Sequence, residues 1–255
     1  MLVTPLARRS WETLRTLIDH YPQTKALVAM LYRNRSHAGR VLAETLHDYA
    51  NRNDVIVLAL PRGGVPVAFE IAKSLIAPLD VFIVRKLGVP GHEELAMGAI
   101  ASGGIQVLNE SVLSALKIQP SVIDKVAARE QIELERREHS YRSDREPLNL
   151  EAMIVILVDD GLATGASMKA AVRAVKTRNP KKVIVAVPVA EKEVYLELGR
   201  EVEEIICAAT PYPFQGVGQW YGDFTQTTDE EVRTLLALAK IPPSHVVPKE
   251  SSVNL

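Results

Sequence analysis

Apolar residues recur along the chain in two alternating patterns. Short runs rich in β-branched residues, typical of strands buried on both faces of a parallel sheet, lie at 55–60, 153–158, 183–187 and 204–208. Apolar positions with helical spacing follow the first three of these runs, at 67–75, 168–175 and 191–198. Because strands and helices alternate, the sequence predicts an α/β fold with a parallel sheet flanked by helices.

Residues 89–104 interrupt this alternation with glycine, proline and charged residues. The segment has little apolar content to fix it, so the sequence predicts a flexible loop. The short runs 97–101 and 105–108 flank a Gly-Gly turn, and we expect them to pair as a hairpin. A highly charged helix is predicted to follow near Pro120, with mixed charges spaced as on a solvated helical face.

The two ends of the chain differ from this central pattern. Residues 1–34 contain an amphipathic helical pattern followed by a proline, and they predict a helical appendage used for packing or for dimer formation. Residues 35–240 hold the predicted main domain. Residues 241–255 are polar and contain proline, so we expect a frayed tail.

Composition narrows the classes of function. The 255 residues carry a formal net charge of −1, which gives no electrostatic reason to expect a nucleic acid or an anionic membrane as partner. No apolar run approaches the roughly 18 residues of a membrane-spanning helix. The single cysteine, Cys207, can form no intrachain disulfide and supplies no metal cluster. A reducing compartment is consistent with this, and we expect a cytoplasmic protein.

Two adjacent carboxylates, Asp159 and Asp160, follow the buried run at 153–158. Ligands of open α/β sheets bind beyond the carboxyl ends of the strands, so these side chains are placed for binding. The loop after them contains small residues and hydroxyls, and a helical pattern begins within it. Its backbone N–H groups and the helix N-terminus could therefore surround a phosphate. The candidate binding residues of this loop are Gly161, Leu162, Ala163, Thr164, Gly165, Ala166 and Ser167.

Further candidate anion ligands follow two other predicted strands. Directly after the first buried run, a turn with two glycines is free to present backbone N–H groups. Its candidate residues are Arg62, Gly63 and Gly64. The run 80–84 predicts another strand, which ends on Arg85 and Lys86. We expect these two cations at the same edge of the sheet as the other loops, where they would suit an anion.

These motifs resemble those of type I phosphoribosyltransferases. Residues 153–167 resemble that family's signature for phosphoribosyl pyrophosphate (PRPP): an apolar strand, an acidic pair and a short loop ending in Thr-Gly. The Pro-Arg-Gly-Gly turn resembles the family's pyrophosphate loop, and the segment 85–88 resembles the start of the mobile loop in adenine-type members. The resemblance covers nearly the whole chain. It implies a Rossmann-like parallel sheet with a flexible hairpin loop and a small C-terminal hood.

The resemblance implies a role for each group of candidate residues. Asp159 and Asp160 would bind the ribose 2′- and 3′-hydroxyls, and the loop after them would hold the 5-phosphate. The glycine turn at 61–64 would contact the diphosphate. Arg85 and Lys86 would stabilise the same diphosphate as it leaves. Mg²⁺ is the implied cofactor, held mainly by PRPP, with Asp159 or Asp160 as a candidate direct ligand.

Residues 214–224 alternate aromatic residues with glycines, a composition that suits a cap over a flat ring. By the resemblance, this segment would be a hood over an acceptor base, with Trp220 and Tyr221 as the stacking residues. Simple packing of Trp220 and Phe224 on the edge of the domain is an equally good interpretation.

The motifs leave the acceptor open. Hypoxanthine- and guanine-type members carry an aspartate immediately before Thr-Gly, where this chain has Ala163. That favours an adenine-, uracil- or orotate-like acceptor, whereas the Pro-Arg-Gly-Gly turn is more similar to xanthine-type loops. We therefore expect transfer of the phosphoribosyl group from PRPP to a nucleobase-like acceptor, in a homodimer. The alternative is a regulatory protein that senses PRPP or a nucleotide without transferring it.

Overall fold

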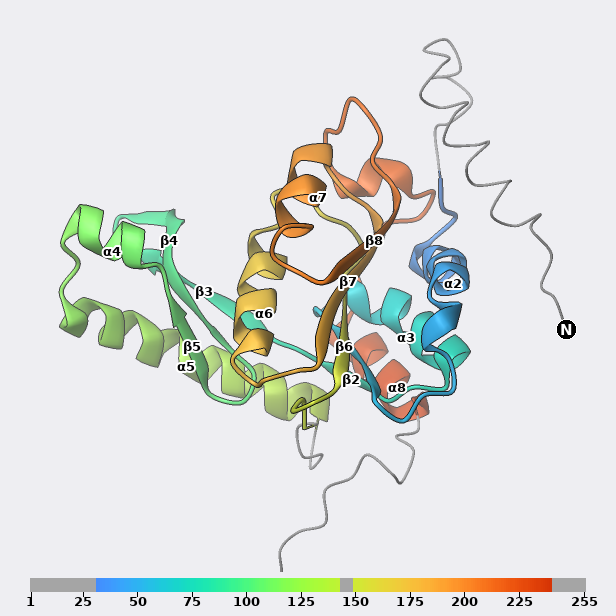
Figure 1. The fold of residues 1–255 in the computed structure, drawn as a ribbon. Helices are drawn as coiled ribbons and strands as arrows, with labels where there is room; N and C mark the ends of the chain where they lie inside the picture. The colour runs from blue at the N-terminus through green and yellow to red at the C-terminus, as the bar shows by residue number, and fades with distance from the viewer. Residues whose placement is uncertain (1–30, 143–148, 240–255) are drawn as a thin grey trace, which may run out of the picture.

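A five-stranded parallel sheet lies at the centre of the computed structural model, which describes residues 31–142 and 149–239 (Figure 1). All four neighbouring pairs of strands are parallel, which confirms the predicted α/β fold. Most of the predicted appendage at 1–34 and the whole tail at 241–255 lie outside the described residues. In spatial order the strands are β2 (Leu79–Val81), β1 (Val55–Ala59), β6 (Ile154–Val158), β7 (Lys182–Val189) and β8 (Glu204–Ala209).

The strand order reverses direction between β1 and β6. The chain leaves β1 towards β2 on one side, and it leaves β6 towards β7 and β8 on the other. Because β1 and β6 are paired in register up to Ala59 and Val158, the loops that follow them lie side by side. In open α/β sheets this reversal point is where ligands bind.

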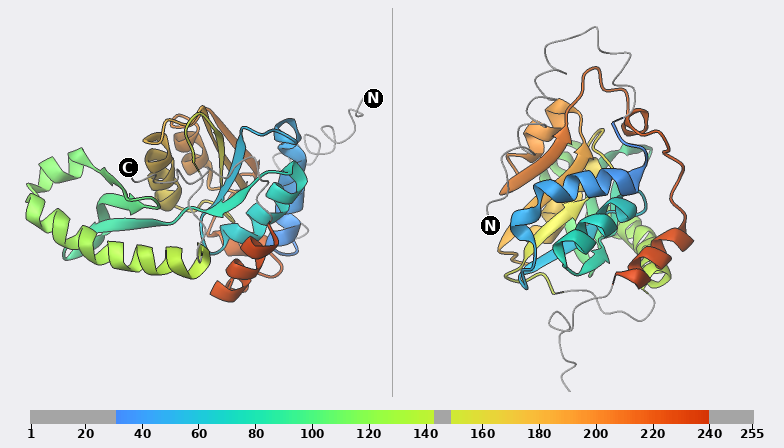
Figure 2. Two further views of the ribbon diagram at one scale, coloured as in Figure 1. Left: turned by 90° about the horizontal axis from the view of Figure 1, so that it is seen from below. Right: turned by 90° about the vertical axis from the view of Figure 1, so that its right-hand side faces the viewer.

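Helices cover both faces of the sheet (Figures 1 and 2). One face carries α2 (Arg35–Thr45), α3 (Gly64–Leu75) and α8 (Asp229–Leu238). The other carries α6 (Ala166–Lys176) and α7 (Lys192–Leu198). Two short 3₁₀ helices, η2 (His47–Tyr49) and η3 (Val217–Trp220), connect elements of these layers. No helix of the described ranges is long and apolar enough to cross a membrane.

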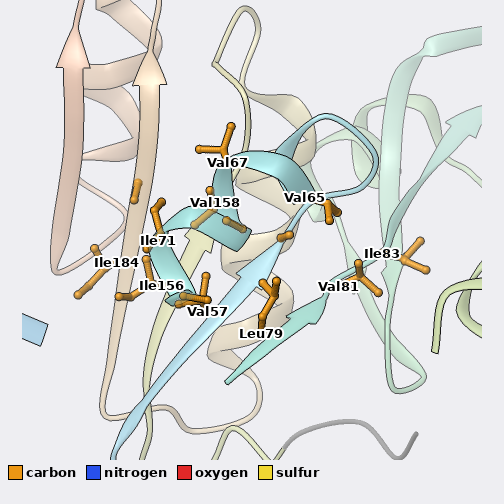
Figure 3. Packing of buried hydrophobic residues seen from close by; sticks show 14 of the residues in the cluster. Val57, Val65, Val67, Ile71, Leu79, Val81, Ile83, Ile156, Val158 and Ile184 are labelled. Carbon is orange, nitrogen blue, oxygen red and sulfur yellow. The ribbon is translucent and has the colours of Figure 1, made fainter. Parts of the chain in front are cut away.

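Successive residues of the central strands pack against opposite helical layers, because strand side chains alternate between the two faces. Val57, Ile156 and Val158 lie in the cluster under α3, as Figure 3 shows. Leu58 and Leu157 lie in the cluster under α6. All five are at most 2% exposed, and burial of each such side chain stabilises the fold by about 1.5–3 kcal/mol.

A second, antiparallel sheet projects from the body of the molecule (Figure 2). It consists of β3 (Val84–Val89), β4 (His92–Ala101) and β5 (Ile105–Leu108), and it packs with α4 (Glu110–Leu116) and α5 (Pro120–Arg142). We call residues 84–142 the arm. The predicted pairing of 97–101 with 105–108 is confirmed, with Gly98 opposite Leu108 and Ala101 opposite Ile105.

The expected strand at 80–84 is divided between the two sheets. β2 ends at Val81 and β3 begins at Val84, so the residues between them carry the chain from the body into the arm. Phe82 and Ile83 are nevertheless buried, in the α6-side and α3-side clusters respectively. The apolar run therefore continues unbroken across the change of sheet, and periodicity alone could not locate it.

Most of the stretch expected to be a loop, 89–104, is strand. β4 begins at His92, so only a tight turn around Gly91 separates it from β3. Apolar side chains hold the hairpin against α5: Leu87 and Met97 are fully buried, and they share a cluster with Leu134. The local sequence does not indicate these contacts, because the apolar partner Leu134 lies on a helix more than 30 positions later in the chain.

Candidate functional site

The loops after β1 and β6 pack directly on one another. The Leu60 N–H donates to the Val158 carbonyl at 2.9 Å. A Cβ atom added to Gly64 would lie 2.6 Å from that same carbonyl oxygen, and one added to Gly63 would lie 2.0 Å from Asp160 Oδ2. The two glycines of the turn are therefore required by close approach to the acidic pair. The structure brings these two motifs together as the sequence predicts.

The two carboxyl groups of the acidic pair are both half-buried but have different partners. Asp159 Oδ1 accepts a hydrogen bond from the Asp160 N–H at 2.8 Å. Burial, with the neighbouring Asp160 carboxyl, raises the pKa of Asp159 well above its usual range. Burial also raises the pKa of Asp160, but the Arg35 guanidinium opposes that shift. The pKa of both carboxyls is thus raised, and Asp160, beside Arg35, is the member of the pair that ionises more readily.

Arg35 is the partner that sequence reading missed. It is the first residue of α2, and its Nε donates to Asp160 Oδ2 at 2.8 Å. Its Nη1 donates to the Thr225 carbonyl at 2.7 Å, and its Cζ lies 3.9 Å from the centre of the Phe224 ring. The side chain is 11% exposed. Nothing in the sequence indicates this contact, because Arg35 and Asp160 are 125 positions apart.

Tyr221, expected as a stacking residue, supports the acidic pair from inside the protein. It is 4% exposed, and its hydroxyl donates to the Asp160 carbonyl at 2.6 Å. Burial, with a further contribution from Asp160, raises its pKa strongly. Its ring packs 5.4 Å from Tyr32, so it does not present a free face. Trp220 is half-buried and stacks on Phe214 with the ring centres 6.5 Å apart.

The loop after the acidic pair is anchored at two positions. Leu162 is 2% exposed; its N–H donates to the Val189 carbonyl at 2.9 Å, and its carbonyl accepts from the Glu191 N–H at 2.9 Å. The Leu162 side chain is thus a core anchor, and only its backbone could serve a ligand. Gly165 has φ +67°, and a Cβ there would lie 2.4 Å from Val194 Cγ1.

Between and after these anchors, Ala163, Thr164 and Ser167 are exposed. Before them, Gly161 packs beside Val217 of η3. Ala166 begins α6, so these residues lie at the N-terminus of an 11-residue helix. Unpaired backbone N–H groups and the helix dipole make such a terminus favourable for an anion. The loop can therefore accept a phosphate-sized group next to the acidic pair.

The three expected cations have different surroundings. Arg62 Nη1 is 3.7 Å from Asp229 Oδ1, at the first residue of α8. Arg85 lies inside β3 and is held by Glu130 of α5, with Nε to Oε2 at 2.9 Å. Lys86 is exposed and, because strand side chains alternate, faces away from Arg85. The expectation that Arg85 and Lys86 end a strand of the parallel sheet is thus wrong, since both belong to the arm.

A magnesium ion would find few protein ligands here. Within the described ranges, no three or more histidine, cysteine, aspartate or glutamate side chains are grouped so that they could hold a metal. Asp159 and Asp160 offer at most two carboxylates. Mg²⁺ commonly binds through one or two carboxylates together with substrate phosphates and waters. The site therefore fits Mg²⁺ that arrives with a phosphorylated substrate, and it does not fit a cation bound by protein alone.

Comparison with known proteins gives a consistent result. The sequence model of the family described as "Phosphoribosyl transferase domain" matches residues 28–216. A protein of Mycobacterium tuberculosis, in strains CDC 1551 and H37Rv, is named "Putative phosphoribosyl transferase". It is 46% identical over 206 residues, which are 81% of this chain and 46% of the relative. The chain thus spans about half the length of the curated relatives it matches.

A solved structure is similar along its full length. The crystal structure of the protein TT1426 from Thermus thermophilus is 42% identical in sequence and superposes with a TM-score of 0.75. The match covers 82% of this chain and 99% of that one. The described domain is therefore similar, in both sequence and fold, to the Thermus thermophilus protein.

Proposed function

The chain belongs to the phosphoribosyl transferase domain family, and from this premise we propose that it transfers the 5-phosphoribosyl group of PRPP to a nucleobase-like acceptor, with release of pyrophosphate. The observation that carries the proposal is the meeting of three motifs at the reversal point of the sheet. The acidic pair, the glycine turn at 61–64 and the loop at 161–167 lie together there. We assign the acidic pair to the ribose of PRPP, the loop at 161–167 to its 5-phosphate and the glycine turn to its diphosphate.

In the proposed complex, the Asp159 and Asp160 carboxyl groups accept hydrogen bonds from the ribose hydroxyls and hold the sugar in place. The backbone and hydroxyl groups of residues 163–167 bind the 5-phosphate at the start of α6. During transfer, the bond between ribose C1 and the diphosphate oxygen breaks as a bond from an acceptor nitrogen to C1 forms, and the proton on that nitrogen passes to the departing diphosphate or to water. Positive charge on the sugar and negative charge on the leaving group must both be stabilised.

We propose that the cations stabilise the diphosphate as it leaves. Backbone N–H groups of the glycine turn and the Arg62 side chain are the nearest candidates, because that turn packs on the acidic pair. Arg85 and Lys86 would have to approach by movement of the arm, and Arg85 would have to leave Glu130. Mg²⁺ bound to the diphosphate would supply further charge neutralisation, and Asp159 or Asp160 is the candidate protein ligand.

The test is an assay for pyrophosphate release. Protein, PRPP and Mg²⁺ are incubated with adenine, uracil, orotate, hypoxanthine, guanine and xanthine in turn, and pyrophosphate is measured against a reaction without base. Release that depends on one base, together with formation of the corresponding nucleoside monophosphate, would support the proposal. No binding of PRPP by calorimetry would contradict it. Gel filtration with light scattering would test the proposed homodimer.

A PRPP sensor is the second candidate, and Ala163 favours it. This residue stands immediately before Thr164-Gly165, is exposed, and offers no acid or base next to the phosphate loop. A protein that only binds PRPP or a nucleotide needs no such group. Tight PRPP binding without pyrophosphate release on any base would indicate the sensor, whereas turnover with a base would indicate the transferase.

A further inference from the structure

Arg35 joins three parts of the candidate site although it belongs to none of the sequence motifs. It contacts the acidic pair through Asp160 and the residues after η3 through Thr225 and Phe224. Gly63, in the turn after β1, is also close: a Cβ there would lie 3.3 Å from Arg35 Nε. A guanidinium with this set of neighbours has little freedom to adopt another position.

Backbone hydrogen bonds fix the segment that carries Arg35. The Tyr32 N–H donates to the Trp220 carbonyl at 3.0 Å, and the Gly222 N–H donates back to the Tyr32 carbonyl at 2.8 Å. Next to it, Asn34 Oδ1 accepts from the His37 N–H at 2.9 Å and caps α2. Arg35 thus begins a capped helix, directly after a segment paired with the hood.

The contact uses only one oxygen of the Asp160 carboxylate. Arg35 Nε donates to Oδ2, and Gly63 lies against the same oxygen. Within the described part of the chain, no side chain donates a hydrogen bond to Oδ1. A carboxylate held through one oxygen cannot rotate freely, so the direction of the second oxygen is set before any ligand arrives.

We propose that Arg35 is a positioning residue of the ribose site: it holds Asp160 by Oδ2 so that Oδ1 is directed at a ribose hydroxyl of the phosphorylated substrate. This inference rests on the proposed function, because it assigns the acidic pair to the ribose. Arg35 itself does not touch the sugar. Its positive charge also offsets one carboxylate beside a substrate that carries several negative charges.

Arginine suits this position better than lysine. One guanidinium can donate to Asp160 and to the Thr225 carbonyl at the same time, while its flat face stacks on Phe224. A lysine ammonium could replace the charge and one hydrogen bond, but not the stacking or the fixed fork. The position of Asp160 therefore depends on the segment after η3, through Thr225 and Phe224.

The test compares ligands that differ only in a ribose hydroxyl. Ribose 5-phosphate and its 2-deoxy and 3-deoxy analogues carry no diphosphate and need no metal, and their dissociation constants can be measured by competition with PRPP. We expect at least one analogue to bind the unaltered protein about tenfold more weakly than ribose 5-phosphate. In Arg35→Gln this ratio should fall to about threefold or less. Arg35→Lys should give an intermediate ratio.

Arg40→Gln is the matched control, because Arg40 also lies on α2 and pairs with Glu70 at 2.6 Å, on the exposed side. It should keep the full ratio. A general loss of stability in Arg35→Gln would weaken all ligands equally and leave the ratio unchanged, so the ratio separates positioning from folding. If Arg35→Gln binds too weakly to measure, the ratio in Arg35→Lys decides.

Two results would overturn the inference while leaving the proposed function in place. One is an unchanged ratio in both Arg35 variants. The other is an unaltered protein that binds PRPP but does not distinguish ribose 5-phosphate from either deoxy analogue. Failure of the unaltered protein to bind PRPP would instead contradict the proposed function itself.

Discussion

Gly63 lies so close to the Asp160 carboxylate that a Cβ atom at this position would be 2.0 Å from Oδ2. The backbone of Gly63 is helical, with φ −61° and ψ −32°, so alanine would suffer no backbone strain there. Any effect of Gly63→Ala therefore comes from contact with Asp160. Position 63 therefore requires a small residue because of the nearby carboxylate, and it does not require the backbone flexibility of glycine.

We expect Gly63→Ala to weaken PRPP binding by about tenfold or more, which corresponds to about 1.4 kcal/mol, because the carboxylate or the turn must shift. Calorimetric titration with PRPP measures the effect. Gly199→Ala is the control: its backbone is also helical, and a Cβ there would meet Ile205 of β8 at 3.3 Å, at the C-terminal end of α7. Equal affinity in Gly63→Ala and the unaltered protein would show that the acidic pair does not need its observed position.

The two members of the acidic pair should respond differently to neutralisation, because only Asp160 is paired with a cation, Arg35. Folding raises the pKa of Asp159, so above pH about 4 the folded state binds more protons at this site than the unfolded state. The ionised carboxyl therefore makes folding less favourable as pH rises towards its folded pKa. We expect Asp159→Asn to stabilise the ligand-free protein by about 1 kcal/mol or more at pH 8, and the gain to shrink as pH falls towards 4.

Asp160→Asn should destabilise the protein, because it leaves the largely buried Arg35 guanidinium without its charged partner. The cost should be about 1–3 kcal/mol. Denaturant unfolding at pH 5 and pH 8 measures both variants. Stabilisation by Asp160→Asn would contradict a stabilising pair with Arg35, and a pH-independent effect of Asp159→Asn would contradict the raised pKa of Asp159.

Both substitutions together should abolish PRPP binding while the fold persists. Each lost charge-assisted hydrogen bond to the ribose would cost about 1.5–3 kcal/mol, and the two side chains contribute little to core packing. Calorimetry gives the affinity and circular dichroism checks the fold. An unchanged PRPP affinity in the folded double variant would show that the acidic pair is not the ribose site.

Local signals in the sequence predicted the elements that form the site, but not the contacts between distant segments. The apolar run before Asp159 and the glycines after β1 identified two neighbouring loops, since each motif is continuous in the chain. Arg35 could not be found in this way. Tyr221 was found but misplaced, because aromatic residues between glycines do not reveal which ring turns inward to donate to a backbone carbonyl.

The arm offers a test of the role proposed for Arg85. In this structure Arg85 is held by Glu130, in a pair whose side chains are 29% and 12% exposed. If Arg85 must leave Glu130 to reach the diphosphate, Glu130→Gln should release it and tighten PRPP binding by about two- to fivefold. That range corresponds to the worth of a partly exposed ion pair, up to about 1 kcal/mol.

The matched control for the arm is Glu133→Gln. Glu133 lies on the same helix and accepts hydrogen bonds from Arg136 and Arg137. Its substitution by glutamine therefore removes a charge from α5 without affecting Arg85. Its PRPP affinity should equal that of the unaltered protein. The same affinity in Glu130→Gln would show that Arg85 serves the arm and not the diphosphate.

Ala163 makes a prediction about the acceptor. It is exposed immediately after the buried anchor Leu162, so a longer side chain fits there without disturbing the core. General acid or base assistance contributes about 10²–10⁴-fold, and Ala163→Asp could supply it only to a purine that presents N7 at this point. We therefore expect Ala163→Asp to leave adenine and pyrimidine transfer no faster, and to raise any trace activity on hypoxanthine or guanine. The added charge should weaken PRPP binding, because it lies beside the phosphate loop.

Ala163→Asn, which has the same size without the charge, is the control and should show no gain on either purine. Steady-state rates on each base measure the outcome. If the unaltered protein turned over hypoxanthine or guanine as fast as other bases, another residue must act as the base, and Ala163 would not restrict the acceptor.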